Sequence, residues 1–413
     1  MADRETSVAF AKPCLDEREA EAAGRAVMSG WVTQGPEVEA FEREFAAGVG
    51  SAHACAVSSC TAALHLALQV VGVKPGDEVV TVSHSYIATA GSIRHCGAKP
   101  VFVDIEPRTF NMDPARVERA VTERTRAILC VHQLGMPCDL GAILPIAARL
   151  GLPVVEDAAC ALGSEILWNG QWERIGKPHA DVACFSFHPR KLVTTGDGGM
   201  ITTANAEWDR RLRLLRHNGM DTPDRARHES GRVEFERYPE VGYNYRMTDI
   251  QAAVGRVQLT RLAQLVARRR EIAGRYVELL GNIQGLGLPH EPKWCRTNWQ
   301  SYAVRLPTGC AQRRVMQFML DRGVATRRGV MCIHREECYA KMSDRPNSLR
   351  DARTNPSDAH KPTGKSVPHT DLRESETAQD ATILLPMHHA LSDDDLRRVA
   401  DALRTACRES PAH

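Results

Sequence analysis

Short apolar runs alternate with helix-period segments along the first half of this chain of 413 residues. The helix-period segments lie between most of the runs, for example at residues 62–71 and 139–150. Strands that are apolar on both faces and separated by helices are typical of a mainly parallel sheet covered by helices. The pattern therefore predicts an α/β fold, with strands at residues 54–57, 78–82, 100–104, 126–131, 153–156 and 181–187.

The second half of the chain begins with a strand at residues 200–203 and then leads to a long helix. Thr248 with Gln251 three residues later is the signature of a capping box, which predicts that the helix begins there. The helical pattern meets no proline before Pro289. We expect the three arginines at residues 268–270 to lie on the solvated face of this helix.

The α/β pattern returns towards the C-terminus, which indicates a second domain. We expect a large domain at residues 1–259, including an N-terminal segment, and a smaller C-terminal α/β domain at residues 260–413. A polar stretch at about residues 341–370 has little periodicity and is interpreted as an exposed insertion. The smaller domain is predicted to contain a strand at residues 302–306, a helix at 311–322, a return strand at 323–327 and a helix at 392–406.

Composition and charge exclude several classes of function. The formal net charge of +2 gives no electrostatic reason to expect nucleic acid or an acidic membrane as a partner. No apolar run is long enough to span a bilayer, and the first residues lack the layout of a signal peptide, so we expect a cytoplasmic protein. The 13 cysteines are scattered without a Cys-x-x-Cys pair. We therefore expect reduced core cysteines and no metal site, although Cys332, His334 and Cys338 lie close together in sequence.

Candidate chemistry follows the strands, because ligands of such sheets bind beyond the carboxyl ends of the strands. After the first strand, residues 58–62 place small and hydroxyl-bearing side chains at the start of an apolar helix, which suits a phosphate. Taken alone, a plain Ser/Thr helix cap is the simpler explanation. Tyr86 follows the second strand and could stack on a flat ring, and Asp157 follows the fifth.

Lys191 follows the strand at residues 181–187, and glycines stand at positions 196, 198 and 199. A buried ammonium is costly unless it is paired or loses its proton, and a neutral lysine amine attacks carbonyl groups to form a Schiff base. Taken alone, Lys191 is more simply an exposed loop residue. Together, however, the phosphate site, the aromatic ring, the carboxylate and the lysine are what pyridoxal 5′-phosphate (PLP) requires.

Four motifs resemble those of the DegT-type sugar aminotransferases, which are fold-type I PLP-dependent transferases. The resemblance spans roughly residues 12–335 and returns at residues 383–403. The motifs are Gly30-Trp-Val-Thr-Gln-Gly-Pro36, Glu156-Asp157-Ala-Ala, Ser186-Phe-His-Pro-Arg-Lys191 with Thr194-Thr-Gly-Asp-Gly-Gly199, and Gly242-Tyr-Asn-Tyr-Arg-Met-Thr-Asp249.

The resemblance implies a role for particular residues. Lys191 would form the Schiff base with PLP, Asp157 would pair with the pyridine nitrogen, and Tyr86 would stack on the ring. In a homodimer with a shared active site, Asn244 of one subunit would reach the phosphate in the other. The resemblance also implies cofactor contacts by Cys60, Thr61, Ala62, Cys160 and Ser186, and substrate contacts by Thr33 and His188.

Two of these positions depart from the usual motif of the family. Cys60 stands where a glycine is usual, but its backbone N–H can still bind phosphate. Cys160 stands where a glutamine or histidine near the phenolic oxygen of the cofactor is usual, and a thiol is a weak hydrogen-bonding group.

The resemblance implies that the chain is an aminotransferase. It would move an amino group from an amino acid, glutamate in our expectation, to a keto-sugar that is linked to a nucleotide, in amino-sugar biosynthesis. The alternatives are a cyclitol aminotransferase, a PLP-dependent sugar dehydratase and a non-catalytic regulator with the same fold. Lys191 argues against the dehydratase, because such members of the family typically carry a histidine there.

Overall fold

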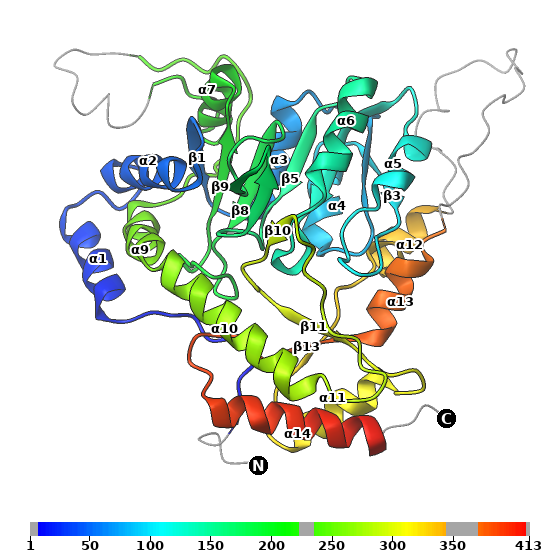
Figure 1. Ribbon diagram of the computed structural model, residues 1–413. Helices are drawn as coiled ribbons and strands as arrows, with labels where there is room; N and C mark the ends of the chain where they lie inside the picture. Colours follow the sequence, from blue (N-terminus) through cyan, green and yellow to red (C-terminus); the bar gives the residue numbers. More distant parts are fainter. Residues whose placement is uncertain (1–6, 223–234, 344–370, 410–413) are drawn as a thin grey trace, which may run out of the picture.

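A seven-stranded sheet forms the centre of the computed structural model, which describes residues 7–222, 235–343 and 371–409 (Figure 1). The strand order is β1-β9-β8-β5-β4-β2-β3. Neighbouring strands pair in parallel from β3 to β8, and β9 runs antiparallel to both β8 and β1. The predicted mainly parallel α/β sheet is therefore confirmed. Its strands are β1 (His53–Val57), β2 (Glu78–Val82), β3 (Lys99–Val103), β4 (Thr125–Val131), β5 (Val154–Asp157), β8 (Val182–Ser186) and β9 (Gly199–Thr203).

Helices cover both faces of the central sheet, because each strand presents apolar side chains to both sides. One face packs against α3 (Cys60–Val70), α4 (Ile87–His95) and α7 (Ala206–Leu215). The other face packs against α2 (Pro36–Val49), α5 (Pro114–Ala120) and α6 (Leu140–Leu150).

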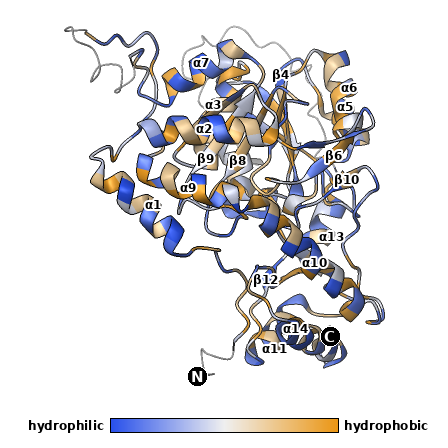
Figure 2. Cartoon of the chain, turned by 60° about the vertical axis from the view of Figure 1, so that its left-hand side comes forward, coloured by the Kyte–Doolittle hydropathy of each residue, from blue (hydrophilic) through white to orange (hydrophobic). Residues whose placement is uncertain are grey.

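The helix that begins after Thr248 is not continuous, so this part of the prediction was wrong. The capping box at Thr248 is present and starts α9 (Asp249–Thr260), but the chain bends at Arg261 before α10 (Leu262–Leu280). The Arg261 guanidinium contacts Asp16 at 2.5 Å and Glu19 at 2.9 Å at the start of α1 (Glu17–Met28), which anchors the bend. Figure 2 shows α1 and α9 beside α2 on one side of the sheet.

Helix α10 leads from the central sheet to a smaller α/β layer at the bottom of Figure 1. A three-stranded antiparallel sheet of order β11-β13-β12 packs there with α10 around one apolar cluster. The predicted boundary near residue 260 lies beside the bend at Arg261. The elements are β11 (Tyr302–Arg305), α11 (Gln312–Asp321), β12 (Arg327–Arg328), β13 (Thr382–Leu385) and α14 (Asp393–Glu409).

Two further expectations for this part of the chain were wrong. The return strand is limited to β12, because Val324 forms an isolated bridge with Val8 of the N-terminal segment instead of joining the sheet. Arg269 does not lie on a solvated face: its side chain is buried, and its Nη1 donates to the carbonyl oxygens of Trp299 at 3.1 Å and Gln300 at 2.8 Å.

Several short elements had no clear signal in the sequence. A second small sheet contains β6 (Glu165–Trp168), β7 (Gln171–Arg174) and β10 (Cys295–Arg296), and two helices, α12 (Glu337–Ser343) and α13 (Arg373–Ala381), flank the predicted insertion. The insertion itself lies almost wholly outside the described residues. Within the described residues, no helix combines the length and apolarity of a bilayer-spanning segment. All 13 cysteines are free.

Candidate active site

The turn between β1 and α3 forms a tightly packed helix N-terminus. The side chain of Ser59 caps α3 by accepting a hydrogen bond from the backbone N–H of Ala62 at 3.2 Å. The N–H groups of Cys60 and Thr61 belong to the first turn, whose amides have no partner inside a helix. A side chain at Gly199 would place its Cβ 2.7 Å from the Ser59 carbonyl, so only glycine lets β9 approach this turn. The arrangement suits a bound phosphate.

Asp157 is buried at the carboxyl end of β5 with both carboxylate oxygens hydrogen-bonded. Thr89 donates its hydroxyl to Oδ2 at 2.8 Å, and the backbone N–H of Ala159 donates to Oδ1 at 3.2 Å. Burial raises the pKa of Asp157, although these two hydrogen bonds act in the opposite direction. The carboxylate is thus fixed in position. A positively charged partner would offset the free-energy cost of burying its charge.

Lys191 lies beyond the end of β8, and its amine reaches the end of β5. The Nζ atom donates to the thiol sulfur of Cys160 at 3.0 Å. Burial opposes the charged amine, but the nearby Cys160, Cys60 and Asp157 outweigh it and raise the pKa of Lys191. We had expected burial to favour the neutral amine of Lys191. The sequence could not show otherwise, because Cys160, Cys60 and Asp157 lie on elements that are distant in the chain.

Lys191 lines a hollow that brings several predicted residues together. Ser186 and Cys160 line it with Lys191, together with Asn298 and Gln300. The side-chain amide of Asn298 donates to the Cys160 carbonyl at 2.8 Å, and that of Gln300 donates to the Arg190 carbonyl at 2.8 Å. Asn298 and Gln300 were not identified in the sequence; polar residues directly before the strand that begins at Tyr302 were the available signal.

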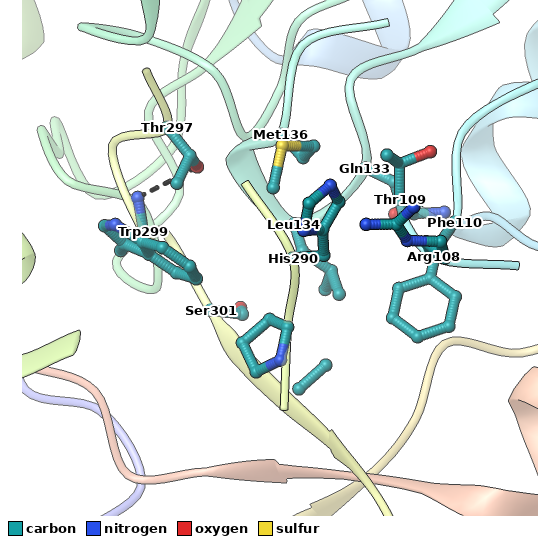
Figure 3. A pocket seen from close by; sticks show the side chains of 12 residues that line it. Arg108, Thr109, Phe110, Gln133, Leu134, Met136, His290, Thr297, Trp299 and Ser301 are labelled. Carbon is teal, nitrogen blue, oxygen red and sulfur yellow. Dashed lines mark hydrogen bonds between the residues drawn. The ribbon is translucent and has the colours of Figure 1, made fainter. Parts of the chain in front are cut away.

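A second hollow lies on the other side of the same segment (Figure 3). Thr297, Trp299 and Ser301 line this hollow, whereas the alternate residues Asn298 and Gln300 line the hollow at Lys191. The side chain of Thr297 accepts a hydrogen bond from the N–H of Trp299 at 3.2 Å, as Figure 3 shows. Residues 297–301 therefore form a wall between two hollows.

A buried pair of side chains, His132 and Glu156, lies at the end of β5. The Nε2 of His132 lies 2.7 Å from the Glu156 carboxylate, and the backbone N–H of Cys138 donates to Nδ1 at 2.9 Å. Because a backbone N–H only donates, Nδ1 is an acceptor and the ring proton on Nε2 points to Glu156. The backbone N–H of His132 also donates to the Asp157 carbonyl at 3.0 Å, so the pair holds the strand that carries Asp157.

The other predicted residues lie around this centre with exposed side chains. Tyr86 is 70% exposed and precedes α4, which also carries Thr89. Thr33 and His188 are exposed as well. Asn244 is exposed on a segment whose next residue, Tyr245, accepts a hydrogen bond from the N–H of Ser58 at 2.7 Å. Within one chain, the structure therefore brings together the residues at Lys191 but leaves these side chains open to solvent.

The residues present fit a cofactor with a phosphate, a basic ring nitrogen and a carbonyl group. The first turn of α3 offers free amides for the phosphate, and Asp157 offers a fixed carboxylate for a protonated nitrogen. Lys191, which lines the hollow, offers an amine for the carbonyl group.

A model of the DegT/DnrJ/EryC1/StrS aminotransferase family matches residues 13–364 of the chain. Among curated proteins, the spore coat polysaccharide biosynthesis protein SpsC of Bacillus subtilis (strain 168) is 36% identical over 399 residues, which cover 96% of each chain.

Two solved structures illustrate the similarity in three dimensions. The PLP-form of the putative sugar aminotransferase Spr1654 from Streptococcus pneumoniae matches with a TM-score of 0.84 and 26% identity, over 98% of this chain and 99% of that one. DesI, solved in the presence of its TDP-sugar product, matches with a TM-score of 0.82 and 30% identity, over 98% of this chain and 93% of that one.

Proposed function

The chain belongs to the DegT/DnrJ/EryC1/StrS aminotransferase family and is a PLP-dependent aminotransferase of fold type I, and from this premise we propose that it aminates a nucleotide-linked keto-sugar with glutamate as donor. The presence of a TDP-sugar product in the DesI structure supports the nucleotide linkage. The observation that carries the proposal is the half-buried Lys191, whose amine lies beside Cys160 on a hollow and near the fixed carboxylate of Asp157.

In this proposal the predicted residues divide the work of binding the cofactor and moving the proton. The amides at the start of α3 and the hydroxyl of Ser186 bind the phosphate, and Tyr86 covers the ring. Asp157 holds a proton on the pyridine nitrogen, and the Nζ of Lys191 binds the cofactor and carries a proton from the α-carbon of the donor. PLP supplies the electron sink that makes this proton acidic. Thr33 and His188 are proposed to contact the substrate.

Cys160 is proposed to face the phenolic oxygen of the cofactor. Its sulfur already lies 3.0 Å from the Nζ of Lys191, so it is close to the atom that holds the cofactor. Because a thiol is a weak hydrogen-bonding group, we expect this contact to be weaker than one made by glutamine or histidine.

The test is the visible absorption spectrum of the PLP-loaded protein with and without L-glutamate. We expect conversion of the PLP form to the shorter-wavelength pyridoxamine form, and its reversal by one member of a panel of nucleotide-linked keto-sugars. Lys191→Ala should abolish both conversions, and borohydride should attach the cofactor to Lys191 in the parent protein only. Conversion by glutamate with reversal only by a cyclitol ketone would contradict the sugar substrate, and labelling of another lysine would contradict the assignment of Lys191.

The homodimer and the cytoplasmic location stay predictions.

A further inference from the structure

Two arginines from different parts of the fold lie beside one aromatic ring next to the Lys191 loop. The guanidinium carbon of Arg190 lies 5.3 Å from the ring centroid of Phe10, and that of Arg327 lies 5.9 Å from the same centroid. Arg190 directly precedes Lys191, Arg327 belongs to β12, and Phe10 belongs to the N-terminal segment. We call Arg190 and Arg327 the Phe10 arginine pair.

Among the residues that the structure describes, no carboxylate lies within ion-pair distance of either member of the Phe10 arginine pair, and both residues are exposed. The neighbouring Arg328 shows the contrast, because its guanidinium contacts Glu336 at 3.2 Å. The ring attracts each guanidinium, but no carboxylate of the described residues neutralises either charge. An anionic ligand would do so.

Further positive charge lies close to the N-terminal segment. Arg269 is buried, and its Nη1 donates to the carbonyl oxygens of Trp299 and Gln300 rather than to a carboxylate. Burial, together with the charges of Lys12, Arg269, Arg261 and Arg268, lowers the pKa of His389. These four cationic side chains therefore lie close enough to His389 to act on its pKa.

The backbone of Arg190 is hydrogen-bonded to a residue of the hollow at Lys191. Gln300 lines the hollow and donates its side-chain amide to the Arg190 carbonyl at 2.8 Å. Arg190, which directly precedes Lys191, is therefore held next to the hollow.

We propose that the Phe10 arginine pair binds the diphosphate of the nucleotide-linked sugar. The inference rests on the proposed function, and it adds the residues that recognise the anionic part of that substrate. Guanidinium groups suit this task because their planar donors match phosphate oxygens in pairs. The second anion of the reaction, the dicarboxylate glutamate, is the competing occupant that the experiment distinguishes.

The experiment measures binding of inorganic pyrophosphate, uridine diphosphate and thymidine diphosphate to the PLP-loaded protein by calorimetry. We expect binding that weakens with added salt and that falls about tenfold or more in Arg327→Ala and in Arg190→Ala, because each loses charge-assisted hydrogen bonds. Arg327→Lys keeps the charge without the planar donors and should lie between. The matched control is Arg328→Ala, whose parent side chain is already paired with Glu336, and it should bind within about twofold of the parent.

The possible outcomes separate this inference from the proposed function. Unchanged pyrophosphate binding in both alanine variants, or no binding of any probe to the parent protein, would overturn the role of the arginine pair. If the alanine variants only raised the glutamate concentration needed for the spectral conversion, the arginine pair would belong to the donor site. That result would also overturn its role in binding the diphosphate. These binding measurements need no sugar turnover, so a failure of the proposed function would be visible separately as an absent spectral conversion.

Discussion

The carboxylate of Asp157 is buried at the end of β5, where two donors hold its two oxygens. A second layer holds one of these donors, because the hydroxyls of Ser85 and Thr89 lie 2.8 Å apart. Such an arrangement fixes the direction of the carboxylate before any ligand arrives. The charged form of the carboxylate is unfavourable in this buried place, so burial raises the pKa of Asp157.

Asp157→Asn tests whether this carboxylate acts on the pyridine nitrogen of the cofactor. The amide keeps the shape of the side chain but removes the charge that stabilises a protonated nitrogen. We expect the conversion of the PLP form by glutamate to slow by about 10²-fold or more, measured by stopped-flow absorption.

The stability of the cofactor-free variant is the control for Asp157→Asn. A carboxyl group whose pKa is raised by folding is destabilising when it is ionised at neutral pH. The neutral amide should therefore leave the melting temperature of the cofactor-free protein unchanged or raise it. A clear loss of stability with unchanged conversion kinetics would assign Asp157 a structural role instead.

Residues that directly follow a strand could be identified from the sequence, because the end of a parallel strand has a known place in the fold. Lys191 and Asp157 are of this kind, and the structure puts both at one edge of the sheet. Asn298 and Gln300 could not be identified, since they reach the hollow from a segment more than 100 residues beyond Lys191. Arg269 could not either, because helical periodicity does not show which carbonyl oxygens lie beside a long side chain.

At the level of elements, two helices receive their N-terminal cap from a distant carboxylate. Neither Gly35 before α2 nor Leu372 before α13 caps its own helix with a side chain. Asp249, at the start of α9, instead accepts hydrogen bonds from the N–H groups of Gly35 at 2.7 Å and Val38 at 3.0 Å. Asp104 likewise accepts from the N–H of Ser375 at 2.8 Å. Each carboxylate meets the positive end of a helix dipole and joins two elements.

Asp249→Ala should therefore destabilise the protein although it is not expected to touch the cofactor. The buried carboxylate caps α2 and ties it to α9, and its loss leaves amides of the first turn without an acceptor. We expect a loss of about 2 kcal/mol, visible as a fall of several degrees in the melting temperature.

Two control variants accompany Asp249→Ala. Asp249→Asn keeps one acceptor oxygen and should lose less stability. Asp394→Ala removes an exposed carboxylate of the first turn of α14 that contacts Arg397 at 2.9 Å, and it should change the stability by less than about 0.5 kcal/mol. If Asp249→Ala melted with the parent protein, the cap would contribute nothing to stability.

The starts of helices were more predictable than their course. The capping box at Thr248 is local in sequence, and it starts α9 as expected. The bend at Arg261 has no local sequence signal, since neither a proline nor a glycine stands there. Arg261 instead contacts Asp16 and Glu19, which lie far away in the chain. Short strands had the same difficulty: β12 is brief because Val8 pairs with Val324, a contact between the N-terminal segment and the smaller layer.

At the level of the whole molecule, the alternation of strands and helices was sufficient to predict the central sheet, because each strand carries apolar residues for both faces. The position of the smaller layer required contacts between distant segments. Arg269 on α10 holds residues 299 and 300, and Gln300 in turn holds the loop of Lys191. The two layers are therefore linked at the candidate active site by hydrogen bonds that no local pattern contains.

A shared active site is the remaining prediction at this scale. Hydrogen bonds fix the backbone beside Asn244, because the Tyr245 carbonyl accepts from Ser58 and the Tyr243 carbonyl accepts from Asn218 at 2.9 Å. Its side chain nevertheless is exposed in the single chain. A fixed backbone with an outward amide is what a residue needs if it reaches the phosphate in a partner subunit. We therefore expect Lys191→Ala and Asn244→Ala, each inactive as a homodimer, to recover part of the activity when mixed.

The recovery follows from how the lesions are distributed in a mixed dimer. If the site is shared, one of its two pockets receives both lesions and the other receives neither, so about half of the parent activity per mixed dimer should return. The matched control is a mixture of Lys191→Ala with Asp157→Asn, because both residues belong to the same subunit's pocket and each pocket of the mixed dimer then keeps one lesion. Subunit exchange is verified independently with two affinity tags. Verified mixed dimers of Lys191→Ala and Asn244→Ala that stay inactive would place Asn244 in its own subunit's pocket or outside any pocket, and would end the proposal of a shared site.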